Sequence, residues 1–562
     1  MSQPPVFPQQ PPAGPPPGFP PPGFAPPPPP RRSNAGVLLG SAGIVFFAVV
    51  VAVVILVVMN NQAEADRPHA TVLASEIEAH SDTRLKVAEY RVYTDLLPGN
   101  AYAGEQSSLI SAMYAGLTRS DPDSGEPEPR VARDWKTDDG TKWTITLKSG
   151  YTFQNGEKVT AKSFMDAWNF NVKTDNKQTN QQLYKPIKGY KDAKKSGKLS
   201  GVEAPDDHTL VVTLDEPIPD FPSLLAHPAF YPMAAACLDD TSACGRTPIG
   251  DGPFKPTGDI AGGATASLDR WADYAGDKPQ YAGIDVTYYD TPDKLQVMIA
   301  SDGVDVGQTS YTSDSSSGGQ AEDFPANTMS SLVMPDSKGY KDPKFRQAIS
   351  LALDRQELAS TFNYKSKPAT SFTPPAALGS AKDSCGNCTG DKEKAKQLLD
   401  DSKWKKSKTF KLSVFDYQSQ WGQAACAEIQ DALGLTCEVR SIPSSDYGKI
   451  DASKTKTALL WSWAGDYGTS NAFLSGFYVD SLKVKDSKYT KLLDAANKHS
   501  TVKEAADGYA KAEARLDDFL PAIPLVTDVT SVLHADRVLS ESVSVDLTTG
   551  GVQLDLLQVK RT

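Results

Sequence analysis

The sequence predicts a globular protein of two or three lobes that contains both strands and helices, and three observations lead to that expectation. The chain has 562 residues, which is more than one simple domain needs. From residue 87 onward, segments with period-two alternation follow segments with helical spacing. Hydrophobic residues make up 39% and charged residues 23%, which are ordinary values for a globular protein. The formal net charge of −11 argues against nucleic acid as a partner.

The N-terminal part has a different composition. Residues 1–34 are proline-rich, with 16 prolines among the first 30 residues, and they predict a disordered or polyproline-II tail. Residues 35–59 carry no charge and would span roughly 37 Å as a helix, enough for a bilayer core of about 30 Å. Residues 60–85 are expected to form a polar stalk.

Charges on either side of residues 35–59 predict the orientation of this transmembrane helix. Arg31 and Arg32 precede it, whereas Glu64 and Asp66 follow it. The positive-inside rule therefore predicts a single-pass protein of the cell membrane, with a cytoplasmic N-terminus and the remaining chain outside. Cleavage at residues 63–65 (Ala-Glu-Ala) is an alternative that would release the outer part. The tail either is solvated or binds a cytoplasmic partner that recognises proline.

Six cysteines form three pairs that are local in sequence, and none precedes Cys237. An even number of cysteines in local pairs favours disulfides in an oxidising compartment. Residues 385–388 read Cys-Gly-Asn-Cys, for which redox or metal binding is the alternative. Without a second such motif, the disulfide is the preferred interpretation. The candidates are Cys237, Cys244, Cys385, Cys388, Cys426 and Cys437.

The clearest local elements precede residue 171. Alternation predicts a strand over 87–92 and a hairpin over 135–148 that turns at Asp139-Gly140. Helical spacing predicts a helix over 109–117. Thr160 is expected to cap a helix over 161–170.

A second informative stretch lies at residues 460–468. A β-prone run over 458–463 ends in a small residue, a glycine and Asp466. A carboxylate at a strand end, close to Trp461 and Trp463, suits a ligand ammonium group in a partly desolvated cleft. The alternative is an aspartate that starts a turn after a buried strand.

Several motifs in order resemble the family 5 extracytoplasmic solute-binding proteins, the oligopeptide, dipeptide and nickel receptors of ABC importers. The resemblance covers most of residues 85–530 and rests on the block 114–164, Pro248-Ile249-Gly250-Asp251-Gly252-Pro253-Phe254, the segment 342–355 and Trp463-Ala464-Gly465-Asp466-Tyr467. In that family the second of these motifs usually has Thr where this chain has Asp251. A lipid-bearing cysteine near the N-terminus is also absent from this sequence, and the membrane helix takes its place.

The resemblance implies a two-lobed periplasmic-binding-protein-like α/β fold with a hinged cleft and an extra β-rich subdomain. It places the first lobe and this subdomain at 86–332, the second lobe at 333–526, and a return to the first lobe at 527–562. A peptide would bind between the lobes, which close over it, and the permease subunits of an ABC importer would be the partners. The ligand backbone is expected to pair as an added strand.

The resemblance also implies roles for particular residues. Asp466 would bind the α-ammonium group of the peptide, with Trp463 and Tyr467 as walls and with Gly465 and Trp461 beside them. Trp421 either walls the cleft or packs inside the second lobe.

Motifs for catalysis or for metal binding are not evident in the sequence. The six histidines lack ligand spacing, and no Gly-x-Ser-x-Gly nucleophile motif occurs, so we expect no cofactor, no metal and no enzymatic activity. Two other functions stay open. One is a sensor that signals through the membrane helix, and the other is a receptor for a non-peptide solute such as a nickel chelate, heme or an oligosaccharide.

Overall fold

The computed structural model describes residues 82–90, 95–101, 104–289, 292–301, 303–309, 319–337, 339–362, 365–405 and 408–560. The predicted tail, the predicted membrane helix and the stalk up to residue 81 lie outside the described residues. Among the helices that are described, none is both long and apolar enough to cross a membrane.

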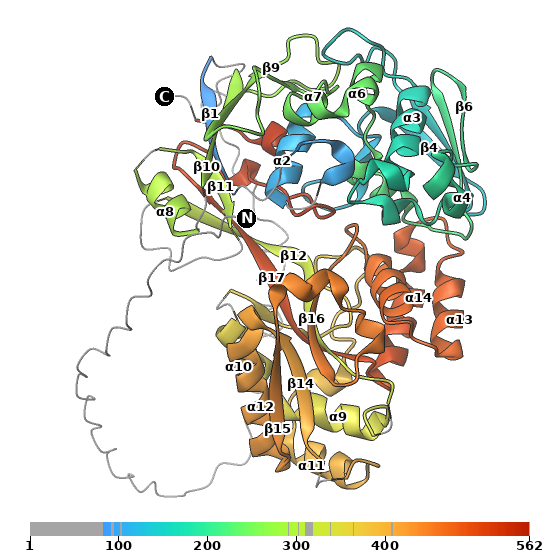
Figure 1. The fold of residues 1–562 in the computed structure, drawn as a ribbon, viewed down its shortest axis with the longest axis vertical. Helices are drawn as coiled ribbons and strands as arrows, with labels where there is room; N and C mark the ends of the chain where they lie inside the picture. Colours follow the sequence, from blue (N-terminus) through green and yellow to red (C-terminus); the bar gives the residue numbers. More distant parts are fainter. Residues whose placement is uncertain are drawn as a thin grey trace, which may run out of the picture. The chain divides into compact units, whose positions relative to one another are not determined.

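One sheet of eleven strands runs through both lobes (Figure 1). Its order is β15-β14-β16-β12-β17-β11-β1-β10-β9-β8, and β13 pairs with β17 outside this path. The strands are β1 (Arg84–Tyr90), β8 (Phe254–Pro256), β9 (Thr265–Arg270), β10 (Gly283–Tyr289), β11 (Val306–Thr309), β12 (Gln320–Val333), β13 (Lys367–Pro368), β14 (Phe410–Phe415), β15 (Cys437–Ile442), β16 (Ala458–Ala464) and β17 (Ala522–His534).

The long strands β12 and β17 join the lobes. They pair antiparallel from Gln320 opposite His534 to Val333 opposite Ala522. At one end β17 also pairs with β11 of the first lobe, and at the other end β12 pairs with β16 of the second. The register shifts between Pro325 and Met329, which bends the ladder between the two lobes. These two strands connect the lobes and form the hinge of the fold.

Among its described residues, the first lobe adds two smaller sheets and seven α-helices. One sheet has the order β4-β5-β7-β6, and the other pairs β2 with β3. Its strands are β2 (Thr118–Ser120), β3 (Pro127–Pro129), β4 (Ala132–Thr137), β5 (Lys142–Leu147), β6 (Val202–Asp206) and β7 (Thr209–Thr213). Its helices are α2 (Gly104–Met113), α3 (Ala161–Val172), α4 (Tyr190–Ser196), α5 (Phe221–Leu224), α6 (Ala235–Asp239), α7 (Thr241–Arg246) and α8 (Pro292–Ala300).

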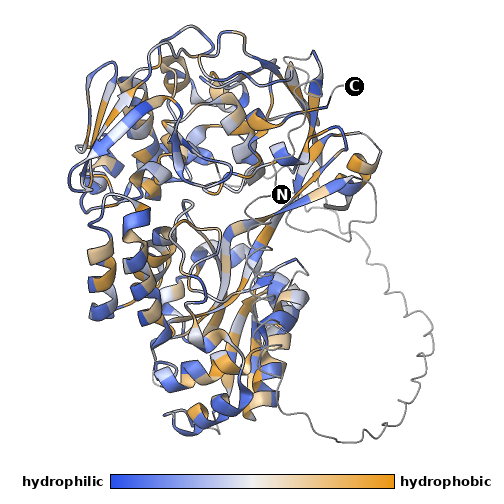
Figure 2. Cartoon of the chain, turned by 180° about the vertical axis from the view of Figure 1, so that it is seen from behind, coloured by the Kyte–Doolittle hydropathy of each residue, from blue (hydrophilic) through white to orange (hydrophobic). Residues whose placement is uncertain are grey.

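The second lobe packs its helices around one core that runs in sequence from Met329 to Val526. Phe345 and Trp404 stack in this core with ring centroids 4.1 Å apart. Figure 2 shows the apolar strands running through the interior, with hydrophilic residues on the outer sides of the helices. The helices are α9 (Pro343–Ala352), α10 (Arg355–Phe362), α11 (Lys392–Asp400), α12 (Ser419–Leu433), α13 (Ser487–Ala496) and α14 (Val502–Asp517).

Local sequence signals succeeded where short-range contacts decide the structure. The predicted hairpin is present as β4 and β5. The helix over 161–170 is present as α3, and the Thr160 N–H donates to Ser163 Oγ at 3.1 Å. The strand over 87–92 starts earlier, as β1, and is described to Tyr90.

The helix predicted over 109–117 was placed wrongly, because the structure has α2 at Gly104–Met113. The chain leaves the helix where residues 250–252 pack against it. The Ala115 N–H donates to Asp251 Oδ1 at 2.8 Å instead of to a helical carbonyl. A Cβ at Gly250 would lie 1.9 Å from the Met113 carbonyl oxygen, so the two segments touch at backbone level. A contact 136 residues away in sequence thus sets the end of this helix.

All three predicted cysteine pairs are disulfides, which favours the disulfide interpretation of residues 385–388 over metal binding. Cys237 pairs with Cys244, Cys385 with Cys388, and Cys426 with Cys437. The third disulfide ties α12 to β15, as two Cα atoms 5.4 Å apart allow.

Candidate functional site

The candidate site is the loop that follows β16, at the bend of the hinge. Ala464, the last residue of β16, lies opposite Thr328 of β12. Asn327 holds the loop twice, because its carbonyl accepts from the Gly465 N–H at 2.9 Å and its Nδ2 donates to the Tyr467 carbonyl at 2.8 Å. A Cβ at position 465 would lie 2.5 Å from Asn327 Nδ2 and 2.9 Å from Phe473. Glycine at 465 therefore lets the loop dock tightly on the hinge strand.

Asp466 is half-buried beside the contact between the lobes. Its carboxylate has no hydrogen-bond or ion-pair partner among the residues that the structure describes. Burial raises the pKa of Asp466 to about 6, and the nearby carboxylate of Asp480 adds to the rise. An anionic group that lacks a cationic partner and is partly removed from water would gain from a bound cation.

Two indoles and a tyrosine lie beside this loop. Trp463 stacks on Phe477, and Trp461 stacks on Tyr447 with ring centroids 4.8 Å apart. The indole N–H groups of both tryptophans are buried and have no acceptor within the described part of the chain. Tyr447 remains 42% exposed, so its ring offers an aromatic surface at the end of β16. Trp461 is only 6% exposed and packs in the core of the second lobe, whereas Trp463 is half-buried beside the loop.

Trp421 and Tyr467 both pack against hydrophobic cores in the structure. Trp421 is 3% exposed in the core of the second lobe, so the structure favours the packing alternative over the cleft wall. Tyr467 was expected as a pocket wall, but its ring packs against the first-lobe core and its hydroxyl donates to Asp220. Tyr467 thus bridges the lobes in this structure.

Other residues of this region escaped the sequence analysis. Asp480 lies in a π-helical segment (Ala472–Ser481) and forms an ion pair with Lys185 of the first lobe at 2.6 Å. Figure 1 shows the corresponding neighbourhood, where α4 approaches α13 and α14. Lys185 opens a lysine-rich stretch over residues 185–198. The sequence did not indicate a role for Asp220 or Asn327, because their hydrogen-bond partners are more than 100 residues away in sequence.

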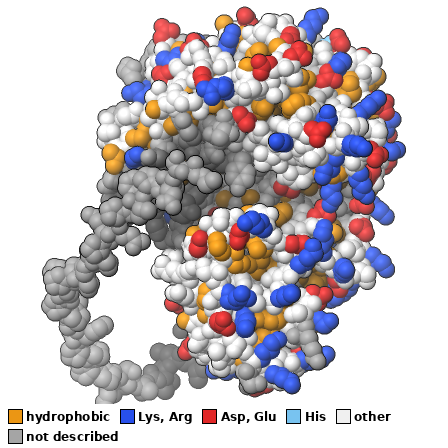
Figure 3. Space-filling model, viewed as in Figure 1, with side chains coloured by type: hydrophobic (Ala, Val, Ile, Leu, Met, Phe, Trp, Pro, Cys, Tyr) orange, Lys and Arg blue, Asp and Glu red, His pale blue; other side chains and the backbone are white. Residues whose placement is uncertain are grey.

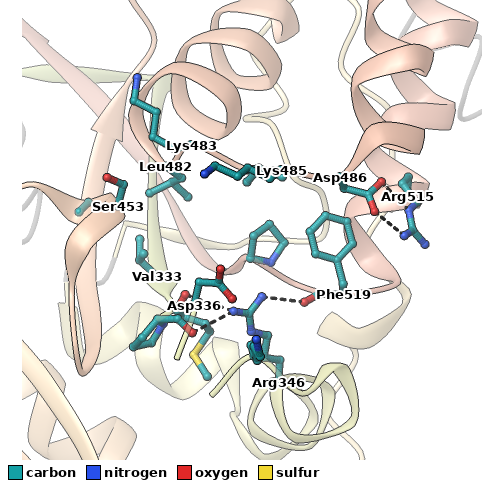
Figure 4. Close-up of a pocket in the computed structure, with 16 residues that line it drawn as sticks. Val333, Asp336, Arg346, Ser453, Leu482, Lys483, Lys485, Asp486, Arg515 and Phe519 are labelled. Carbon is teal, nitrogen blue, oxygen red and sulfur yellow. Dashed lines mark hydrogen bonds and ion pairs between the residues drawn. The ribbon is translucent and has the colours of Figure 1, made fainter. Parts of the chain in front are cut away.

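Two cavities lie away from this loop. One of about 670 Å³ is in the second lobe, between the end of β12, the residues after the π-helical segment and the end of α14 (Figure 4). In it the Arg515 guanidinium pairs with Asp486 at 2.7 Å, and Arg346 donates to backbone carbonyls. The other, of about 570 Å³, lies beside β1. None of the site residues expected from the sequence lines either cavity.

The face drawn in Figure 3 recedes between the upper and lower lobes, and charged side chains border this recess on its right-hand side. Within the residues described, no three or more His, Cys, Asp or Glu side chains group as metal ligands would. The arrangement provides an anion and aromatic rings beside a contact between the lobes. Such groups suit the binding of a solute.

Two lobes joined by a pair of long strands, with such a loop at their junction, define a solute-binding protein of the hinged two-lobe class. The chain belongs to the bacterial extracellular solute-binding proteins, family 5, whose middle region matches residues 126–483.

Relatives cover most of the chain. The probable deoxycholate-binding periplasmic protein YgiS of Escherichia coli is 24% identical over 82% of this chain and 90% of its own length. The periplasmic oligopeptide-binding protein OppA of Salmonella typhimurium is 25% identical over 75% of this chain and 82% of its own. The unliganded open form of the murein tripeptide-binding protein MppA has the same fold, with a TM-score of 0.73 at 20% identity over 87% of this chain and 99% of that one.

Proposed function

We propose that this chain is the extracytoplasmic receptor of an ABC importer and binds peptides between its two lobes. Family membership makes it a solute-binding protein, and several relatives carry names of oligopeptide- or murein-peptide-binding proteins. The receptor performs no reaction on its ligand. Its function is to close around the peptide and present it to the permease subunits, because a ligand that binds the closed state better shifts the population toward it.

The observation that carries the peptide assignment is the unpaired carboxylate of Asp466. A peptide brings an α-ammonium group, which would neutralise this carboxylate and form charge-assisted hydrogen bonds with it. The half-buried ring of Trp463 offers an apolar wall for the ligand. The peptide backbone would then extend beside the strand ends as an added strand, which recognises peptides with little regard to their side chains.

A steroid carboxylate is the second candidate, and the name of the relative YgiS motivates it. The aromatic wall suits a flat apolar body. However, an anionic ligand would meet the Asp466 carboxylate, and like charges repel in a partly desolvated site. The electrostatics of the loop therefore favour the peptide.

Anchoring belongs to the same proposal. The uncharged run over residues 35–59 would hold the receptor at the outer side of the cell membrane, and the proline-rich segment before it would lie in the cytoplasm. The anchor would keep the receptor close to its importer.

Native mass spectrometry of the purified full chain tests the ligand class. We expect adducts with masses of short peptides, and isothermal titration of the stripped protein should show binding of peptides with a free N-terminus. Binding of deoxycholate without any binding of peptides would contradict the proposal and favour the second candidate.

A further inference from the structure

Asp220 is a fully buried carboxylate at the contact between the lobes. It precedes α5 in the first lobe and is 0% exposed. Its Oδ1 accepts from Asn471 Nδ2 at 3.1 Å, and its Oδ2 accepts from the Thr469 hydroxyl. The Tyr467 hydroxyl is a further donor. All three side-chain donors belong to the loop of the second lobe that begins at Asp466.

That loop is fixed on its own lobe as well. The Leu378 N–H donates to the Gly468 carbonyl at 2.9 Å, and the Ser470 N–H donates to the Leu378 carbonyl at 2.8 Å. Toward the first lobe the fit is close, because a Cβ at Gly468 would lie 2.8 Å from Leu547 Cβ. The loop is therefore held between the two lobes, and Asp220 is its hydrogen-bond acceptor on the first-lobe side.

We propose that Asp220 is a positioning residue, which acts through Tyr467, Thr469 and Asn471 to hold Asp466 in place for the ligand ammonium group. These four residues, Asp220 with its three donors, form what we call the interlobe clasp. The inference rests on the proposed function for its ligand, but the clasp itself can be tested without one.

The chemistry of the clasp favours positioning over simple adhesion. A buried carboxylate that accepts several hydrogen bonds contributes little net stability, because desolvation offsets much of the gain. Its loss nevertheless leaves donors without an acceptor at a defined place. The interlobe clasp therefore determines the conformation of the loop more than it stabilises the contact between the lobes. A substitution in the clasp should alter the dynamics of this loop first.

Hydrogen exchange on the full chain without ligand is the first test. Asp220→Ala should speed amide exchange over residues 466–471 at least tenfold, because the loop loses its anchor on the first lobe. Asp215→Ala is the matched control, since Asp215 is an exposed carboxylate five residues away and should leave this exchange unchanged. Unaltered exchange in Asp220→Ala would overturn the clasp. If that variant does not fold, Thr469→Val removes one donor at similar volume and should speed the same amides.

A double-mutant cycle is the second test and connects the clasp to ligand binding. With a short peptide carrying a free N-terminus, Asp220→Ala should weaken affinity about tenfold. In the Asp466→Asn background it should cause no further loss, because the positioned group is already gone. Equal losses in both backgrounds would overturn the positioning role. If the wild-type chain binds no peptide at all, the proposed function fails, while the exchange experiment still decides the clasp.

Discussion

Asp466 is the residue that connects the structure most directly to the proposed function, the binding of a peptide. Its side chain is held beside the hinge by Gly465 and Asn327, lacks a cationic neighbour in the described structure and has a raised pKa. The sequence predicted a carboxylate at a strand end, because strand and turn signals are local. It could not predict that Tyr467 turns to Asp220 or that Trp421 is buried, because both depend on packing with residues distant in the chain.

Replacing Asp466 with Asn should abolish most peptide binding while the fold persists. The amide keeps the size of the side chain but loses the charge that attracts an ammonium group. We expect at least a hundredfold loss of affinity in isothermal titration and a thermal unfolding temperature close to that of the wild type. Asp494→Asn, a change at an exposed carboxylate of α13, serves as the control and should bind normally.

Peptide affinity should also depend on pH. The pKa of Asp466 is raised to about 6, so this carboxyl becomes protonated and uncharged as the pH falls below that value. For a peptide without titratable side chains, affinity should be highest near pH 7 and should fall toward tenfold per pH unit below about 6. Above about pH 8 it should fall again, because the α-ammonium group of the ligand loses its proton. Asp466→Asn should abolish the fall below about pH 6. A flat profile in the wild type would contradict the role of the carboxylate.

At the scale of secondary-structure elements, strands β12 and β17 join the two lobes, because both strands belong to the sheet that runs through each lobe. Sequence patterns predicted hairpins, caps and disulfide pairs, which form between near neighbours in the chain. The end of α2 was misplaced because Asp251 takes the Ala115 N–H from far away in sequence. The interlobe contacts of Lys185 and Asp220 were missed for the same reason.

The disulfide between Cys426 and Cys437 offers a test at this scale. It closes a loop between α12 and β15, and the Cys426→Ser/Cys437→Ser variant should lose about 2–3 kcal/mol of unfolding free energy in urea denaturation. The disulfide between Cys385 and Cys388 closes a shorter loop, so the Cys385→Ser/Cys388→Ser variant should lose less unfolding free energy. The reverse ranking would show that strain or packing, and not loop closure, determines these contributions.

For the whole molecule, buried carboxylates set the expected response to pH. Burial raises the pKa of Asp251 to about 7 and of Asp528 to about 6, as it does for Asp466. Such groups keep their protons longer in the folded state than in the unfolded chain. His227 opposes them, because burial lowers its pKa to about 4.

The free energy of unfolding should therefore fall as the pH rises from about 4 to about 7. Raised carboxyl pKa values contribute stability that is present below the unfolded pKa and is lost as the pH rises through the folded one. Urea denaturation across this range measures the effect. Asp251→Asn, which cannot ionise, should flatten the slope and raise stability at pH 8 by roughly 1–2 kcal/mol. An unchanged slope in this variant would exclude Asp251 as a contributor.

The most direct test of the whole account compares one peptide with its N-acetylated form. Acetylation removes the positive charge and leaves the rest of the ligand intact. Isothermal titration of the wild-type full chain should show at least a hundredfold tighter binding of the free peptide, a difference that should disappear in Asp466→Asn. Equal affinities of the wild type for both peptides would contradict recognition of the ligand ammonium group at this loop.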